Sequence, residues 1–162
     1  SRLERAAHTV KLLRYALVIG TADRPAPSAD LAAEAVLRAG ESIITHRRRA
    51  AAGTGPATGL DSAWQLLVTD PANPRSVAFQ LAELARDLRL AGDEHLAGQA
   101  DEIADSIARA EAESPEAGSD HRAVRLAQLA SDLVGLRERI GARHFVRQAR
   151  RRAADSTWTV IR

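Results

Sequence analysis

Apolar side chains recur at steps of three and four residues along most of this 162-residue chain, and prolines and glycines separate the successive runs. Because an α-helix turns once every 3.6 residues, this spacing places the apolar side chains on one face of a helix. The clearest run comprises Val77, Leu81, Leu84 and Leu88. Strand-like alternation is confined to residues 157–161, a segment too short and isolated to build a sheet. The pattern therefore predicts an all-α fold, an up-and-down helical bundle of five to six helices.

The apolar runs and the breakers between them set the expected limits of the helices. They predict helices over about residues 1–20, 30–51, 61–69, 74–91, 96–113 and 119–140. Ser1 and Glu4 have the spacing of a capping box at the start of the first helix. In the fourth helix, Asn73 is the expected N-cap and is followed by proline. Gly40 is the weak point of the second helix, and Gly135 and Gly141 are candidate bends in the last one.

The length of the chain fits a single domain. We expect residues 1–155 to form the helical bundle and residues 156–162 to form a loosely ordered tail. No apolar run approaches the roughly 20 residues that a membrane span requires, so no membrane association is expected. The chain has no cysteine, which excludes a disulfide framework and a thiolate metal site, and its start lacks the layout of a secretory signal. These features predict a cytoplasmic protein.

The charge pattern gives little support for an anionic partner. The sequence pI is about 9.9, yet the formal net charge is only +2, and Lys11 is the only lysine among the 23 basic residues. Arginines gather on one face of the last helix and beyond it, at Arg139, Arg143, Arg147 and Arg150 or Arg151. Residues 93–120 are strongly acidic. Two interpretations stay open. One is a nucleic-acid-binding face, and the other, which we favour, is a pair of complementary faces on neighbouring helices or solvated faces that contribute little.

The sequence lacks the motifs that carry enzyme chemistry. The glycine-rich loop from Gly53 to Gly59 has no lysine to serve a phosphate-binding loop. None of the five histidines follows a glutamate by three residues, which is the spacing of di-iron bundles, and HExxH and the nucleophile elbow are absent. We therefore expect no catalytic residue, metal or cofactor, and a domain that is not catalytic on its own. A cryptic enzyme with a polar pocket in the bundle stays an alternative.

Three blocks of the sequence carry a resemblance to a known family. They are Leu3-Glu4-Arg5-Ala6 with the following Thr9–Arg14, then Glu41–Arg49, and then Leu66–Leu81. The third block is the most specific, because it joins Leu-Leu, Asp-Pro and Asn-Pro-Arg-Ser at the start of a helix. In order and spacing the blocks resemble the alpha-E domain, a bacterial helical domain of unknown function. Ala7 stands where that family usually has glutamate.

The resemblance implies a role beside an enzyme. Alpha-E domains occur fused to, or encoded next to, a circularly permuted ATP-grasp protein, and often with a transglutaminase-like protease, in systems that form amide bonds on peptides. The resemblance thus implies a helical accessory module that works with a carboxylate-amine ligase. This chain has no ATP-grasp motif, so the chemistry would lie in the partner. Whether the domain also forms a homo-oligomer stays open.

The same blocks supply the candidate contact positions for a partner or ligand. They are Glu4, Arg5, Arg47, Arg48, Asp70, Asn73 and Arg75. Each has a structural alternative. Asp70 and Asn73 are good turn and cap formers, a role that we favour for both, and Arg75 could pair with a neighbouring carboxylate. The arginines of residues 45–49 are expected at a helix end, where they either favour the helix dipole or dock a partner.

Overall fold

The part that the computed structural model describes, residues 1–21, 27–54, 59–113 and 118–145, consists of helices joined by turns, and no strand occurs there. In chain order the elements are α1 (Arg2–Thr21), α2 (Pro27–Ala39), α3 (Ile43–Ala51), α4 (Gly59–Trp64), the π-helical segment η1 (Gln65–Thr69), α5 (Val77–Leu90), α6 (Glu94–Glu113), α7 (Ser119–Ile140) and the π-helical segment η2 (Gly141–Phe145). The predicted all-α class is confirmed. The described residues form seven α-helices rather than the expected five to six.

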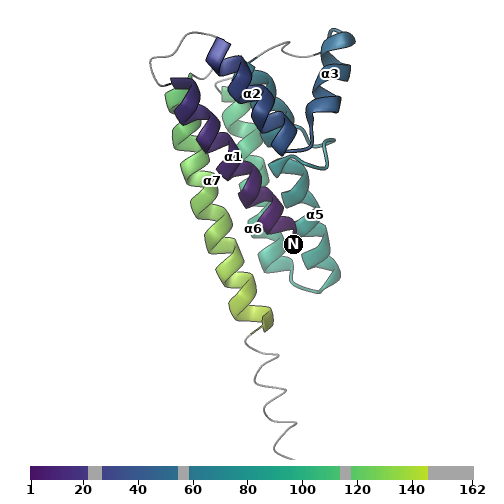
Figure 1. The fold of residues 1–162 in the computed structure, drawn as a ribbon. Coiled ribbons are helices and arrows are strands. Elements are labelled where there is room, and N and C mark those ends of the chain that lie inside the picture. Colours follow the sequence, from purple (N-terminus) through teal and green to yellow (C-terminus); the bar gives the residue numbers. More distant parts are fainter. Residues whose placement is uncertain (22–26, 55–58, 114–117, 146–162) are drawn as a thin grey trace, which may run out of the picture.

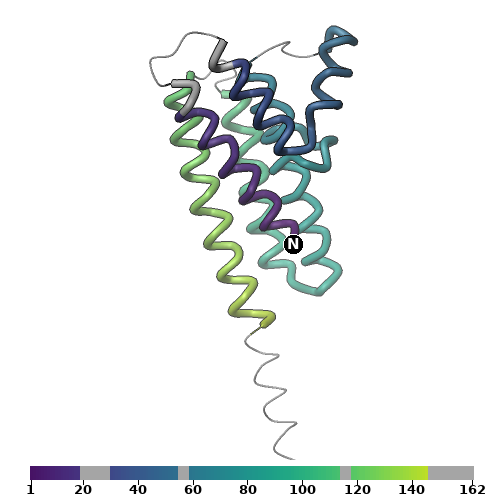
Figure 2. Tube along the Cα trace, in the orientation of Figure 1, coloured from purple at the N-terminus to yellow at the C-terminus, as the bar shows by residue number. Residues whose placement is uncertain are grey.

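The long helices α1, α5, α6 and α7 form the body of the molecule (Figure 1). α1 packs between α5 and α7, and α6 completes the ring by packing on the same two helices. Neighbouring helices run in opposite directions, and Figure 2 shows α1 and α7 side by side along most of the bundle. α2 and α4 pack on each other and on α1 at the upper end of this view. The arrangement is the predicted up-and-down bundle with a helical cap at one end.

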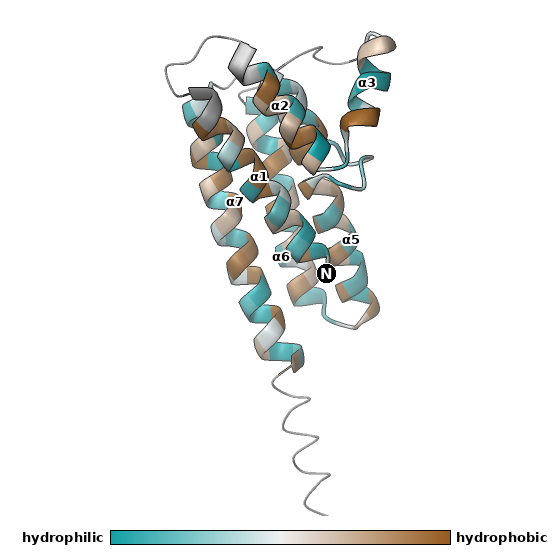
Figure 3. Ribbon diagram, viewed as in Figure 1, coloured by the Kyte–Doolittle hydropathy of each residue, from teal (hydrophilic) through white to brown (hydrophobic). Residues whose placement is uncertain are grey.

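The core consists of the apolar faces that the sequence predicts. In α5, Val77, Leu81 and Leu88 are buried and Leu84 packs against the core from its edge. Leu67 of η1 is also buried, which joins the cap to the bundle. In Figure 3 hydrophobic and hydrophilic stretches alternate along the helices, as expected for helices that bury one face. Burial of these side chains supplies the main free energy of folding.

The helix predicted over residues 30–51 is wrong, because the chain breaks it into α2 and α3. The break lies at Gly40, where a Cβ would come within 3.1 Å of the Leu67 side chain. Glu41 then takes a left-handed φ of 52°, and the Ser42 N–H donates to the Leu37 carbonyl at 2.8 Å. This is the hydrogen bond that closes a helix C-terminus in a Schellman motif. Gly40 is therefore a point of termination rather than of weakness.

The prediction that Asn73 caps the next helix is also wrong. α5 begins at Val77, and its N-cap is Ser76, which has an extended ψ of 154° and whose Oγ accepts the Phe79 N–H at 3.0 Å. Pro74 and Arg75 lie in a turn before the helix instead of in its first turn. Asn73 is unavailable as a cap because its side chain is fully engaged with other segments, as described below.

The other limits agree with expectation more closely. α1, α6 and α7 begin and end within a few residues of the predicted positions. α7 continues through Gly135 without a break, and a π-helical segment begins at Gly141, the other position where a bend was expected. The expected tail 156–162 and the strand-like residues 157–161 lie outside the described residues. In the described part, no helix is both long and apolar enough to cross a membrane.

Candidate functional site

Asp70 is held inside the turn that precedes α5. Its Oδ1 accepts the Ala72 N–H at 2.9 Å, and its Oδ2 accepts a hydrogen bond from the Arg49 guanidinium at 2.5 Å. Only 9% of the Asp70 side chain is exposed. A carboxylate with two such bonds and a guanidinium partner is satisfied by the fold itself. The contacts agree with the structural role that we favoured for Asp70 from the sequence.

Asn73 connects three segments of the chain. Its Nδ2 donates to the Leu66 carbonyl at 2.7 Å and to Ser42 Oγ at 3.2 Å, and its Oδ1 accepts the Arg75 N–H at 3.2 Å. The residue is only 6% exposed. An amide that satisfies its own donors and acceptor in this way stabilises the turn and leaves nothing to offer a ligand.

The π-helical segment explains why the Leu66 carbonyl is open to Asn73. In η1 the Asp70 N–H donates to the Gln65 carbonyl at 3.0 Å, five residues back, rather than to Leu66. The next donor in that pattern would be the N–H of residue 71, which is proline and has none. The Leu66 carbonyl is buried without a backbone donor, and the Asn73 side chain replaces it.

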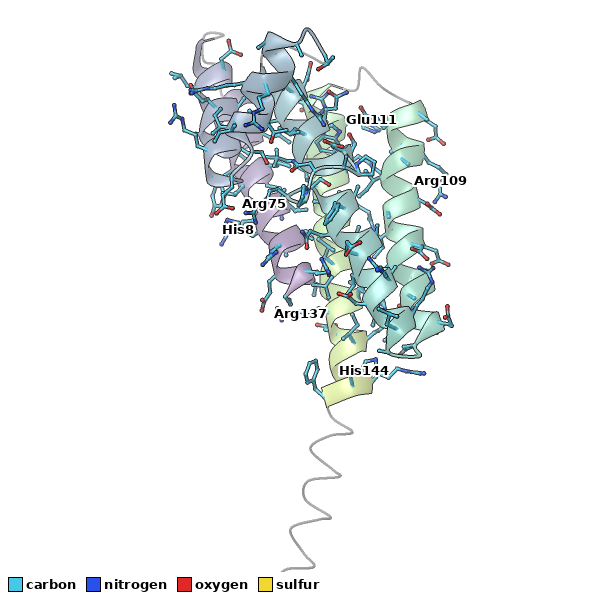
Figure 4. The ribbon with its side chains drawn as sticks, turned by 90° about the vertical axis from the view of Figure 1, so that its right-hand side faces the viewer. His8, Arg75, Arg109, Glu111, Arg137 and His144 are labelled. Carbon is cyan, nitrogen blue, oxygen red and sulfur yellow. The ribbon has the colours of Figure 1, made fainter. Side chains whose placement is uncertain are left out.

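An open groove of about 410 Å³ lies beside this turn. The first turns of α1, the turn between α2 and α3, and the Pro74-Arg75 turn enclose it. Its charged or titratable lining comprises Glu4, Arg5, His8, Glu41 and Arg75. Figure 4 shows His8 and Arg75 beside each other at this edge of the molecule. The groove thus brings together three of the seven predicted contact residues.

The groove contains both paired and unpaired charges. Arg75 forms an ion pair with Glu41, and both side chains are well exposed. The Arg75 carbonyl also accepts a hydrogen bond from Thr9 Oγ1 at 3.4 Å, which ties the turn to α1. Within the described residues, the side chains of Arg5 and His8 have neither a hydrogen bond nor an ion pair. These two side chains are free to meet a ligand.

Glu4 forms the capping box that the sequence predicts. Its N–H donates to Ser1 Oγ at 3.3 Å, and its carboxylate contacts the Ser1 amino group at 2.7 Å. This amino group, followed by the Ser1 hydroxyl, lowers the pKa of the Glu4 carboxyl below its ordinary value. The Glu4 side chain is 73% exposed, so the carboxylate remains open to the groove.

Sequence reasoning missed two members of the groove, His8 and Glu41. His8 lies four residues after Glu4, and this spacing places both on one helix face, so the sequence held a signal for it. No spacing on a shared helix face linked Glu41 to the other residues of the groove. It reaches the groove only because α2 ends at Gly40 and because the 70–76 turn packs nearby.

The remaining predicted residues, Arg47 and Arg48, lie apart from the groove on α3. Arg47 pairs with Glu34 at 3.2 Å, and Glu34 also pairs with Arg38 at 2.7 Å. These two guanidinium groups, Arg38 first, lower the pKa of the Glu34 carboxyl. Arg48 is exposed and has no side-chain partner within the described residues. The candidate residues therefore divide between a turn, a groove and a separate helix.

The described part of the C-terminal arginine face is engaged within the chain. Arg143 pairs with Asp93 at 2.5 Å, His144 contacts the same carboxylate at 3.0 Å, and Arg139 donates to Gln99 Oε1 at 2.6 Å. These contacts join the end of α7 to the start of α6, and they agree with the complementary-face interpretation. Residues 147–152 lie outside the described part.

Asp93 is the carboxylate that Arg143 and His144 share, and only 3% of its side chain is exposed. Burial by itself raises the pKa of the Asp93 carboxyl, but the Leu96 N–H, the Arg143 guanidinium and His144 together outweigh it. The net result is a pKa below the ordinary value of 3.8. The carboxylate is therefore charged at neutral pH and stabilises the junction.

One hydroxyl lies close to an imidazole, as a nucleophile and base would. Ser62 Oγ is 2.7 Å from His46 Nδ1. Ser62 is only 6% exposed, however, and no carboxylate of the described residues hydrogen-bonds the His46 ring. In the same residues, no group of three potential metal ligands occurs. A nearly buried hydroxyl beside an imidazole that no described carboxylate orients has the features of a structural contact.

A comparison with protein families decides the relationship of the chain. Residues 1–145 match the family Alpha-E, described as a predicted alpha-helical domain with a conserved ER motif. The chain belongs to the Alpha-E family. This Alpha-E chain contains two Glu-Arg pairs, Glu4-Arg5 and Glu138-Arg139, and the first pair lines the groove. A search of curated proteins and a search of solved structures each gave no match.

Proposed function

We propose that this Alpha-E domain is a non-catalytic accessory module that works with a circularly permuted ATP-grasp carboxylate-amine ligase. The observation that carries the proposal is the exposure of Glu4 and Arg5 at the groove. The family is described as having a conserved ER motif, and Glu4-Arg5 is one of the two Glu-Arg pairs of this chain. Charged residues that are retained on an exposed surface, away from the core, are typical of binding sites.

Arg5 forms no side-chain hydrogen bond or ion pair with the residues that the structure describes. Arg49, by comparison, holds the nearly buried Asp70 at 2.5 Å. Arg5 has no such carboxylate within the described residues, so its guanidinium offers all its donors to a molecule in the groove. An unpaired arginine in a concave site is suited to binding a carboxylate in a two-pronged geometry.

The groove carries charges of both signs, which fits the substrates of such a ligase. A ligase of this class joins a carboxylate to an amine, so its substrates present both an anionic and a cationic group. Arg5 and Arg75 can meet the first group, and Glu4 and Glu41 can meet the second. These side chains are suited to recognition, because none of them lies in a pair of nucleophile and base. The bond-forming chemistry belongs to the ligase.

The proposal is tested by reconstitution with the cognate ATP-grasp ligase. We expect the two proteins to co-elute, and Arg5→Ala and Glu4→Gln to raise the KM of the ligase for its peptide substrate roughly tenfold, the loss of about one charge-assisted hydrogen bond. Arg14→Ala is the matched control, because Arg14 is an exposed arginine of the same helix and does not line the groove. A ligase that neither binds the domain nor changes its kinetics in its presence would contradict the proposal.

A further inference from the structure

α3 stands apart from the rest of the molecule. Its main packing partner is α2, and none of its nine residues is buried. In Figures 1 and 2 it projects from the upper edge of the bundle. Ile43, at its first position, packs against the core and anchors the helix. A helix of this length is marginal in water without tertiary support. α3 nevertheless leaves most of its surface exposed and buries none of its residues in the core.

One face of α3 carries an apolar side chain next to arginines. Ile44, Arg47, Arg48 and Ala51 are all exposed, and their spacing of three and four residues places them on the same face. Ile44 is 64% exposed. A single exposed isoleucine is ordinary by itself, but arginine is enriched in protein interfaces, and the isoleucine beside it adds apolar area that a partner can bury.

The positive charge of this face is only partly neutralised within the chain. α3 contains three consecutive arginines and no carboxylate. Asp70 takes Arg49, and Glu34 is shared between Arg47 and Arg38. Arg48 has no partner in the described part of the chain. A protein surface that places carboxylates around an apolar side chain would complement the face in both charge and hydrophobicity.

We propose that the α3 face formed by Ile44, Arg47, Arg48 and Ala51 is the docking surface for an acidic, partly apolar patch of the ligase. This inference rests on the proposed function and adds to it a division of labour, in which α3 binds the partner and the groove meets the substrate. A protein occupant is favoured over nucleic acid because phosphates would leave Ile44 exposed in the middle of the contact.

The absence of cysteine from the chain allows a site-specific test. Arg48→Cys introduces a unique thiol that can carry a photocrosslinker, and Ser131→Cys on the exposed side of α7 is the matched control. We expect the probe at position 48, but not the probe at position 131, to crosslink to the ligase. Equal crosslinking from both positions would overturn the docking surface.

Charge reversal gives an independent measurement. Arg47→Glu combined with Arg48→Glu should raise the Kd for the ligase roughly 10- to 100-fold, and more at low salt than at high salt. Arg14→Glu combined with Arg109→Glu changes the net charge equally, at two exposed arginines on other helices, and should leave the Kd within about twofold. Circular dichroism verifies that each variant is folded.

The outcomes separate the two proposals. If the wild-type domain binds the ligase and the reversed α3 binds it equally well, the docking surface is wrong and the accessory function stands. If the wild-type domain does not bind the ligase, the accessory function is wrong and the docking surface with it. Binding to a nucleic-acid duplex that the α3 reversal abolishes, with ligase binding unchanged, would also overturn the docking surface.

Discussion

Two neighbouring sets of polar residues in this domain are used in opposite ways. In the turn before α5, Asp70 and Asn73 are nearly buried and hydrogen-bond to other segments. In the groove beside it, Arg5 and His8 have no intrachain partner in the described residues, and Glu4 is largely exposed. All except His8 belonged to one list of predicted contact positions. A sequence motif can therefore be distinctive for a structural reason. Only the partners of each side chain separate the residues that stabilise the fold from those that are open to a ligand.

The largest effect should come from the turn. Asn73→Ala leaves the Leu66 carbonyl and the Arg75 N–H without their partners in a nearly buried site. We expect the free energy of unfolding to fall by about 2 to 3 kcal/mol, the cost of buried polar groups that lose their hydrogen bonds. Urea denaturation followed by circular dichroism measures it.

Gln128→Ala is the control for that experiment, because Gln128 is an exposed residue of α7 whose side chain donates to Asp132 on the same helix. It should change the free energy of unfolding by less than about 0.5 kcal/mol. If Asn73→Ala costs no more than the control, then water satisfies the turn and the contrast between turn and groove disappears.

A smaller loss is expected at the helix cap. Ser76→Ala removes the Oγ that accepts the Phe79 N–H and donates to the Asp70 carbonyl. We expect a loss of about 1 to 2 kcal/mol in the free energy of unfolding, as for other N-caps. Ser131 is exposed to solvent and lies in the middle of α7. Ser131→Ala should be neutral or slightly stabilising because alanine is the better helix former. Thermal unfolding of the two variants compares them directly.

Acid should remove a further contribution at the junction of α6 and α7. The pKa of Asp93 lies below its ordinary value in the folded protein, so its contribution to stability is complete above the unfolded pKa and is lost as the pH falls through the folded pKa. We expect the Tm difference between the wild type and Asp93→Asn to shrink as the pH is lowered from about 5 to about 2.5. A difference that is independent of pH would show that the pairs with Arg143 and His144 contribute nothing.

The smallest effect on stability should come from the groove. Arg5→Ala removes no side-chain hydrogen bond or ion pair of the described residues and places a strong helix former in α1, so the free energy of unfolding should change by less than about 0.5 kcal/mol. The same variant should show the roughly tenfold KM effect on the ligase. A variant that loses stability and activity together would show that Arg5 supports the fold. The contrast between a structural turn and a binding groove would then be wrong for the groove.

Local pattern was enough to predict the helical class and most of the helix limits. The seam of Val77, Leu81 and Leu88 is buried as predicted, and the Ser1–Glu4 capping box forms. The two errors both came from tertiary contacts. Gly40 ends α2 where the Leu67 side chain crosses it, and Asn73 is drawn away from the helix start by a carbonyl that η1 leaves open. Neither cause is visible in a window of neighbouring residues.

The site was predictable only in part, for the same reason. The sequence supplied Glu4, Arg5 and Arg75 but could not show that one groove joins them. It also could not show that Arg49, rather than Arg47 or Arg48, would neutralise Asp70. Which arginine in a run of three faces a given carboxylate depends on where α3 leaves α2, and that angle follows from the break at residues 40–42.

The left-handed backbone of Glu41 has a consequence for any attempt to make this domain more robust. At a φ of 52°, glycine is the residue with the least steric cost, and a side chain there costs roughly 1 kcal/mol. A thermostability screen would therefore select Glu41→Gly. That substitution would also release Arg75 from its ion pair and remove one of the two acids in the groove. At this position, a substitution that stabilises the fold would remove charges that the groove uses for recognition.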